Sequence, residues 1–271
     1  MGEHTGHGAD TWHWVLALPL LMLTAGYLLA VLFGRRRGRP WPATRTGLCL
    51  AGGALCLAAV LGPLAEAGRN SFPAHMVGHL LISVFGPLLV VLSAPATVAV
   101  RALPVPAARA LVRLLNSHPI RFVSHPVTAG VLSLGGMAAL YGTRLYAMSQ
   151  AEPLLQVAVH AHFIVAGYLF TAAIIAVDPQ RHQASFRLRA AVLVIFAAGH
   201  GVLAKLIYAY PPPGVPPGQA EVGAMVMFYG NDLAELAMAV ILCHSWYAGR
   251  ARAGSSGRIA PSSVTPVTPG S

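Results

Sequence analysis

The stretch PAHMVGHLLISVFGPLLVVLSAPATVAV, residues Pro73–Val100, contains no Asp, Glu, Lys or Arg in 28 positions. An α-helix needs about 20 apolar residues to cross the hydrocarbon core of a bilayer, so this stretch is long enough to do so. Six further apolar segments of about 20–26 residues flank it. They are Trp12–Phe33, Gly47–Glu66, Pro126–Tyr146, Pro153–Val177, Leu188–Tyr210 and Val222–Tyr247. Because backbone groups within lipid must hydrogen-bond to one another, the sequence predicts an all-α polytopic membrane protein with seven transmembrane helices.

The composition of the whole chain agrees with this interpretation. Of the 271 residues, 56% are hydrophobic and only 10% are charged, whereas a soluble domain carries roughly 25% charged residues. A chain with so few charges cannot cover a water-facing surface. The composition therefore argues against a soluble enzyme and against a nucleic-acid-binding protein, and it indicates a protein whose surroundings are a lipid bilayer.

The formal net charge of +10 is explained by the distribution of the basic residues. Fifteen of the 18 Lys and Arg residues fall in alternate connections: Gly34–Thr46, Arg101–His125, the connection that follows Asp178, and the C-terminal tail. Loops rich in Lys and Arg remain in the cytoplasm. The sequence therefore predicts an N-terminus outside and a C-terminus in the cytoplasm, which agrees with an odd number of spans.

This topology divides the chain into three parts. Residues 1–11 are expected to form a short extracytoplasmic tail, residues 12–248 the transmembrane domain, and residues 249–271 a disordered cytoplasmic tail rich in Ser, Thr, Pro and Gly. Within the second basic connection, residues 108–116 place leucines on one helix face and arginines on the other. That pattern predicts a short amphipathic helix lying in the inner membrane interface.

Histidine outnumbers the acidic residues, 12 against 8. His75 and His79 are four residues apart, so they share one face of a helix and can bind one metal ion, and Met76 adds a thioether beside them. The alternative is a pair of interfacial histidines that hydrogen-bond to headgroups or loops. His160 and His162 cannot share a helix face, because two residues turn a helix by about 200°.

Only one member of that second pair can therefore join His75 and His79. We favour His160, and the alternative role for His162 is a hydrogen bond that packs two helices together.

Ionisable residues also occur deep inside the last two predicted spans. Asp232 and His200 lie at similar predicted depth, roughly 15 Å from the outer ends of their helices. A contact between them would orient an imidazole for a metal, with Lys205 and Glu235 as supporting polar groups. The alternative is an interhelical salt bridge that holds the two helices together. Every one of these side chains is predicted in the outer half or near mid-depth of the membrane.

The block His75–Pro104 resembles the signature of the multi-span CtaG family of assembly factors for cytochrome c oxidase of the caa type. The matching features are the H-M-x-x-H helix start, the turn Ser93-Ala94-Pro95 and the R-A-L-P exit at Arg101–Pro104. Further matches are His125-Pro126, the H-x-H helix that ends at Asp178-Pro179, the aromatic exit Leu206–Tyr210 and Asp232.

The resemblance implies a non-catalytic, multi-pass protein of the bacterial plasma membrane that binds or delivers copper while an oxidase is made. Its partners would be cytochrome c oxidase subunits or copper chaperones. The family's histidines correspond to His75, His79, His160 and His162, with Asp232 as the matching acid, and the resemblance implies that these histidines are the metal ligands. His4 and His7, in the N-terminal tail, would capture copper first, or would remain without a ligand.

Two other functions remain open from the residues themselves. Paired helical histidines also ligate haem in b-type haem membrane proteins. Alternatively, Asp232, His200 and Lys205 would form the relay of a proton-coupled transporter, although no internal repeat is evident. No phosphate loop, nucleophile elbow or HExxH motif is present, so the sequence does not indicate an enzyme.

Overall fold

The computed structural model describes residues 7–178 and 183–256, and within them the chain forms helices and no strand. The all-α class is therefore confirmed. The elements in chain order are α1 (His7–Arg36), α2 (Ala43–Val60), α3 (Pro63–Asn70), α4 (Phe72–Leu80), the π-helical turn η1 (Leu81–Phe85), α5 (Gly86–Leu92), α6 (Pro95–Ala102), α7 (Val105–Leu115), α8 (His118–Val123), α9 (Pro126–Gly142), α10 (Leu145–Ala151), α11 (Pro153–Ile175), α12 (Phe186–Ala209) and α13 (Pro217–Ser256).

Six of these helices are long and apolar enough to cross a membrane. They are His13–Arg36, Ala43–Val60, Phe72–Leu92, Pro153–Ile175, Phe186–Ala209 and Pro217–Arg250. The remaining predicted segment forms α9, a shorter apolar helix of 17 residues, about 25 Å long. The protein is thus a helical membrane protein with six helices of full spanning length in its described part.

Two predicted spans end earlier than expected because a turn interrupts them. The segment Gly47–Glu66 stops as a helix at Val60, and Gly62, with φ of 80°, breaks the helix before Pro63 starts α3. A positive φ suits glycine, and proline suits the first turn of a helix. Glu66 consequently lies on α3 and not at the end of a span.

The segment Pro73–Val100 likewise ends as a span at Leu92. Ala94 has φ of 55° and is fully buried, and Pro95 then starts α6. The Tyr27 hydroxyl donates to the Ser93 carbonyl at 3.1 Å, while the Trp41 indole donates to Tyr27 at 2.8 Å. These hydrogen bonds from the first helix and its loop hold the turn in place.

The central span α4–η1–α5 packs closely against two neighbours through glycines. A Cβ on Gly167 of α11 would overlap the backbone of Ser83 in η1. A Cβ on Gly52 of α2 would lie 2.7 Å from the carbonyl oxygen of Gly86. Small residues at such contacts let helix backbones approach closely. These two close approaches place the central span in the core of the bundle.

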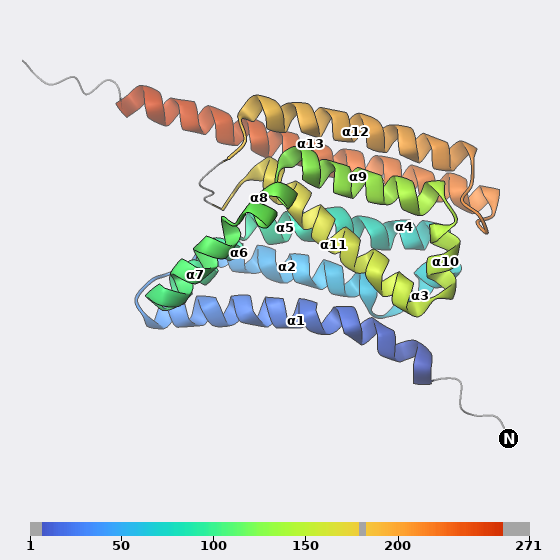
Figure 1. Ribbon diagram of the computed structural model, residues 1–271, viewed down its shortest axis with the longest axis horizontal. Helices are drawn as coiled ribbons and strands as arrows, with labels where there is room; N and C mark the ends of the chain where they lie inside the picture. Colours follow the sequence, from blue (N-terminus) through green and yellow to red (C-terminus); the bar gives the residue numbers. More distant parts are fainter. Residues whose placement is uncertain (1–6, 179–182, 257–271) are drawn as a thin grey trace, which may run out of the picture.

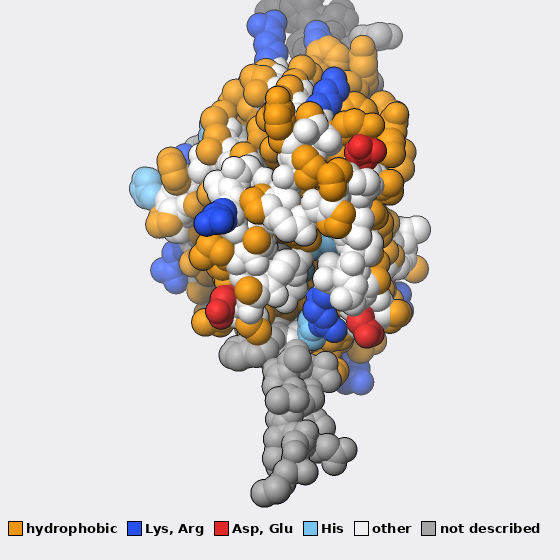
Figure 2. Space-filling view, turned by 90° about the vertical axis from the view of Figure 1, so that its right-hand side faces the viewer, with side chains coloured by type: hydrophobic (Ala, Val, Ile, Leu, Met, Phe, Trp, Pro, Cys, Tyr) orange, Lys and Arg blue, Asp and Glu red, His pale blue; other side chains and the backbone are white. Residues whose placement is uncertain are grey.

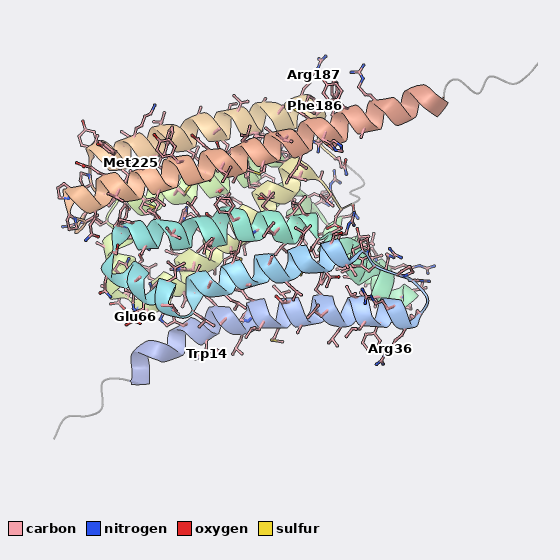
Figure 3. The ribbon with its side chains drawn as sticks, turned by 180° about the vertical axis from the view of Figure 1, so that it is seen from behind. Trp14, Arg36, Glu66, Phe186, Arg187 and Met225 are labelled. Atoms are coloured by element: carbon pink, nitrogen blue, oxygen red, sulfur yellow. The ribbon has the colours of Figure 1, made fainter. Side chains whose placement is uncertain are left out.

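The long helices lie side by side, and α1 begins at the end of the bundle opposite to the one where α13 finishes (Figure 1). Arg36 and Arg187 lie towards one end, which we call the Arg-rich end, whereas Trp14, Glu66 and Met225 lie towards the other (Figure 3). Helices α6, α7 and α8 are at the Arg-rich end, and α3 and α10 are at the opposite end (Figure 1). On that opposite end, basic and acidic side chains are few and scattered among apolar ones (Figure 2).

The last helix is longer than its predicted span. It runs from Pro217 to Ser256, so its final turns extend into the tail that was predicted to be disordered. The first helix similarly begins at His7, within the predicted N-terminal tail. The predicted amphipathic helix of residues 108–116 is observed as α7.

Candidate functional site

Helix α4 positions the two histidines of the H-x-x-x-H motif one turn apart. Pro73 lies in the first turn of the helix, and the free amide of Phe72 donates to the side-chain oxygen of Gln219 at 2.9 Å. This hydrogen bond ties the start of α4 to the start of α13. His79 is 4% exposed and His75 is half-buried, so both imidazoles point into the bundle.

The buried imidazole of His79 contacts a thioether. Its Nε2 lies 3.3 Å from Sδ of Met137 on α9. The Phe163 ring of α11 meets the imidazole edge-on, with 4.6 Å between the ring centroids. His79 therefore joins α4, α9 and α11 at one point, with a nitrogen and a sulfur donor side by side.

His75 lies in an aromatic cage. Its Nε2 is 3.2 Å from the hydroxyl of Tyr141, and the Tyr146 ring centroid is 5.0 Å from that of the imidazole. Phe72 stacks on the imidazole at 6.1 Å. These contacts hold the ring at the α10 side of the cluster, one turn from His79.

The other two histidines of the cluster come from α11 and α12. His160 donates from Nδ1 to the Gln156 carbonyl at 2.8 Å, and this leaves its Nε2 with a free lone pair. His200 is 2% exposed and stacks on Phe196 at 6.1 Å. We call His75, His79, His160 and His200 the histidine cluster, although within the described part of the chain no three of these imidazoles come together closely enough to hold one metal ion.

His162 lies apart from this cluster, as expected from the 200° turn. Its Nε2 donates to the Leu132 carbonyl of α9 at 3.1 Å, across the α9–α11 contact. Gly136 provides the room for this ring, because a Cβ there would overlap His162. The placement corresponds to the helix-packing alternative for His162.

The ionisable groups of α12 and α13 are not brought to His200. Asp232 and Lys205 are both exposed, and the Lys205 ammonium lies 5.9 Å from the Phe228 ring centroid. Glu235 is 7% exposed and accepts a short hydrogen bond from the Asn231 amide. The depth of Asp232 was predictable from its position in the helix, but its direction around the helix axis was not.

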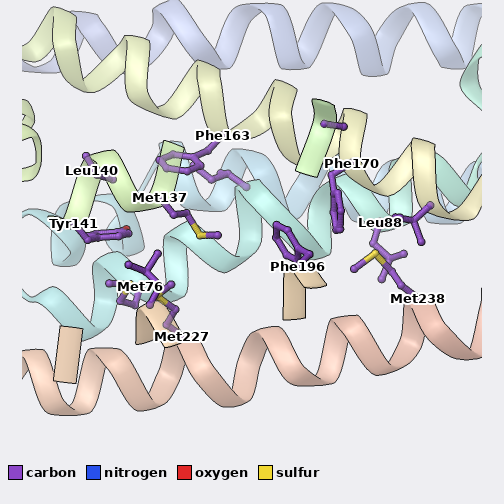
Figure 4. Close-up of a cluster of buried hydrophobic side chains, with 14 of the residues drawn as sticks. Met76, Leu88, Met137, Leu140, Tyr141, Phe163, Phe170, Phe196, Met227 and Met238 are labelled. Atoms are coloured by element: carbon purple, nitrogen blue, oxygen red, sulfur yellow. The ribbon is translucent and has the colours of Figure 1, made fainter. Parts of the chain in front are cut away.

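Three buried methionines lie in the same part of the core. Met76 and Met227 are fully buried and lie beside each other, whereas Met137 is 3% exposed and lies near Phe163 (Figure 4). Sequence reasoning missed Met137, Met227 and Tyr141. A methionine or tyrosine in an apolar helix is usually a packing residue, so no local signal distinguished them.

The donor set decides which metal the site suits. In the described part of the chain, no three His, Cys, Asp or Glu side chains are gathered to hold a metal ion. The contact at His79 combines an imidazole with a thioether, and soft thioether ligands select Cu(I). The residues present therefore suit Cu(I) better than a metal that requires several imidazoles or carboxylates. His4 and the His7 side chain lie outside the described residues.

Fold and site together define a helical membrane protein with a buried histidine–methionine cluster. The chain belongs to the cytochrome c oxidase caa3 assembly factor family (Caa3_CtaG), whose model matches residues 25–249. This match confirms the resemblance seen at His75–Pro104.

Curated relatives come from mycobacteria. Uncharacterized proteins of Mycobacterium bovis and Mycobacterium tuberculosis are each 36% identical over 166 residues, covering 59% of this chain and 25% of theirs. An uncharacterized protein of Mycobacterium leprae is 31% identical over 189 residues, covering 66% of this chain and 28% of its own. The chain thus spans about a quarter of the length of these relatives. No solved structure matches the chain.

Proposed function

We propose that this protein is a non-catalytic assembly factor that carries Cu(I) towards cytochrome c oxidase, in the bacterial plasma membrane. Membership of the oxidase assembly family supports the process, and the cluster around His79 supports the cargo. Oxidase subunits or copper chaperones would be the partners that receive or supply the ion.

The observation that carries the proposal is the 3.3 Å separation between His79 Nε2 and Met137 Sδ. Two donors that share one ion lie roughly 3–4 Å apart, since metal–ligand bonds to nitrogen and sulfur are about 2.0–2.3 Å long, as zinc sites illustrate. Both donors are buried, and the Phe163 ring packs against the imidazole. A buried contact of one nitrogen with one sulfur donor favours a soft monovalent ion.

The remaining imidazoles suggest how the ion moves. His75 lies one turn nearer than His79 to the start of α4, and the hydrogen bond from His160 Nδ1 leaves the Nε2 of that ring with a lone pair. We infer that His160 and His75 pass the ion to His79 and Met137.

We further propose seven spans, with α9 as the fourth, and an N-terminus outside. Two observations support this topology: α1 begins and α13 finishes at opposite ends of the bundle, and the basic residues concentrate at the Arg-rich end. A 17-residue helix can span when the bilayer thins around it. The end of the bundle where α4 and α11 begin would then face the outside.

The two alternative functions gain no support from the family match. A haem bound at His75 would need space beside the imidazole, which Tyr146 and Phe72 occupy. A proton relay through Asp232 and His200 would need these residues in contact, but Asp232 is exposed and His200 is buried.

Copper binding by the purified full chain tests the proposal. Under anaerobic conditions, titration against a Cu(I) chelator should show about one tightly held Cu(I) for each chain, and no Soret band should accompany it. The double variant His75→Ala/His79→Ala should lose this binding. His162→Ala removes an imidazole outside the cluster and should retain it. Equal Cu(I) retention by the double variant and the unaltered chain would overturn the proposal.

A further inference from the structure

A large cavity lies at the Arg-rich end, away from the histidine cluster. It has a volume of about 1080 Å³ and is partly open to the surface. Helices α5, α6, α9 and α11 form its inner wall, and α7 and α8 border its other side. Ligand sites for small molecules have volumes of about 300–1,000 Å³, so this cavity is large enough for a substantial ligand.

The cavity is apolar inside and basic at its margin. Val91 of α5 and Val165 and Leu169 of α11 line the inner wall. Arg101 of α6 and Arg121 of α8 contribute guanidinium groups to the lining. The ligand that matches such a cavity has an apolar body and an anionic head.

The one acidic side chain among the described lining residues does not neutralise these arginines. Asp178 accepts hydrogen bonds from the Thr97 amide at 2.8 Å and from the Ala96 amide at 3.3 Å, at the start of α6. The Thr97 hydroxyl also donates to it. Its carboxylate is therefore engaged by the N-terminus of α6, and the positive charge of the margin remains available.

The amphipathic helix α7 places the cavity at the depth of lipid headgroups. Val112 and Leu115 of α7 line the cavity, whereas Arg109 and Arg113 of the same helix are exposed and do not. Amphipathic helices with basic polar faces lie in the interface of anionic membranes. A lipid of the adjoining leaflet can therefore reach the opening.

We propose that this cavity binds one anionic glycerophospholipid, with its phosphate at Arg101 and Arg121 and an acyl chain along Val91, Val165 and Leu169. Basic pockets between transmembrane helices on the cytoplasmic side bind anionic headgroups in this way. The bound lipid fills the gap between α7–α8 and the bundle and fixes the position of these two helices.

Native mass spectrometry of the full chain tests the proposal. The chain is equilibrated in mixed micelles of phosphatidylglycerol and phosphatidylcholine with identical acyl chains, and the lipid retained is then counted. We expect one phosphatidylglycerol for each chain and a preference of about tenfold or more over phosphatidylcholine. No retained lipid, or equal retention of the two lipids, would overturn the proposal.

Variants separate the cavity from general attraction to basic residues. Arg101→Gln/Arg121→Gln should abolish the headgroup preference, and Arg121→Gln alone should reduce it without disturbing the contact of Arg101 with Trp41. Arg109→Gln/Arg113→Gln removes the same charge at the same end and should leave the preference unchanged. An equal loss in both double variants would contradict a specific site.

A variant of the apolar wall and a soluble competitor test whether the acyl chain of the lipid is bound in the cavity. Val165 is 56% exposed, so Val165→Trp fills the cavity without entering the core, and it should prevent retention of both lipids. Soluble glycerol phosphate should not displace the bound lipid. Displacement by this competitor would show a simple anion site and would contradict the lipid.

Discussion

Met137 is the residue on which the chemistry of the proposed copper site depends. It supplies the thioether 3.3 Å from His79 Nε2, and it comes from a helix 58 positions further along the chain. Replacement by leucine keeps the volume of the side chain and removes the sulfur.

We expect Met137→Leu to weaken Cu(I) binding by roughly tenfold or more, with little effect on folding. Competition with a chelator measures the affinity. Met238 is 2% exposed and lies away from Met137, near Leu88, so Met238→Leu is a matched control that should bind normally (Figure 4). Unchanged affinity in Met137→Leu would exclude the sulfur as a ligand.

Two adjacent glycines of α9 allow a test of the His162 position. Gly136→Ala should displace the His162 ring and break its bond to Leu132, lowering the free energy of unfolding by about 1 kcal/mol. Gly135 has nothing within 4 Å of an added Cβ, so Gly135→Ala should be neutral or slightly stabilising. Thermal unfolding in detergent measures both.

In a His162→Ala background, Gly136→Ala should cost nothing further, because the displaced ring is gone. Additive losses in the double variant would mean that Gly136 packs against something other than His162.

Much of the histidine cluster was predictable from the sequence. The contacts that were not predictable depend on how the helices pack against one another. The spacing of His75 and His79 and the separation of His160 from His162 follow from the angle of helix rotation alone. Met137 was not predictable, because contact with His79 depends on how α9 packs against α4. Depth in the membrane follows from counting residues, whereas the direction of Asp232 depends on the same packing.

The π-helical turn η1 links the core of the bundle to the site. Ser83 in this turn donates from its hydroxyl to the His79 carbonyl at 2.6 Å, and Gly167 of α11 lies against the Ser83 backbone. A π turn within an α-helix is often found at functional sites. The contact between α11 and η1 therefore fixes the backbone that carries His79.

Gly167→Ala should separate α11 from this turn. We expect a loss of about 1–3 kcal/mol in the free energy of unfolding and weaker Cu(I) retention, because backbone atoms cannot make room for the added methyl group. Gly26 of α1 has nothing within 4 Å, so Gly26→Ala is the control and should change neither quantity. A stable Gly167→Ala variant that retains Cu(I) would show that this contact is dispensable.

The sequence predicted where the long helices lie more accurately than it predicted the residues at which they end. All seven apolar segments form helices. Ala94, however, adopts a left-handed conformation that is rare for alanine and could not be predicted from the residue type. Hydrogen bonding around Ser93 stabilises that turn from Tyr27, 66 positions away. A prediction from hydropathy therefore placed the end of the central span at Val100, because the turn at Ala94 depends on tertiary contacts that hydropathy does not contain.

For the whole molecule, α9 decides the topology. Arg113 precedes this helix and Arg144 follows it, and both are exposed. If α9 crosses the membrane, the two positions lie on opposite sides. Each is replaced by cysteine in a chain whose native cysteines, Cys49, Cys56 and Cys243, are changed to alanine.

With an impermeant maleimide, Arg144→Cys should react in intact cells, and Arg113→Cys only after the membrane is permeabilised. This result is expected if the N-terminus lies outside, because position 144 then faces the outside and position 113 faces the cytoplasm. Labelling of both cysteines from one side would mean that α9 does not span.

The copper content of cytochrome c oxidase made in cells tests the central claim most directly. Cells that lack the chromosomal copy would express either the unaltered chain or His75→Ala/His79→Ala at equal membrane levels, and the oxidase would be purified and its copper measured. We predict an oxidase with full copper from the unaltered chain and a several-fold loss of copper with the double variant. Fully loaded oxidase from the double variant would contradict the account.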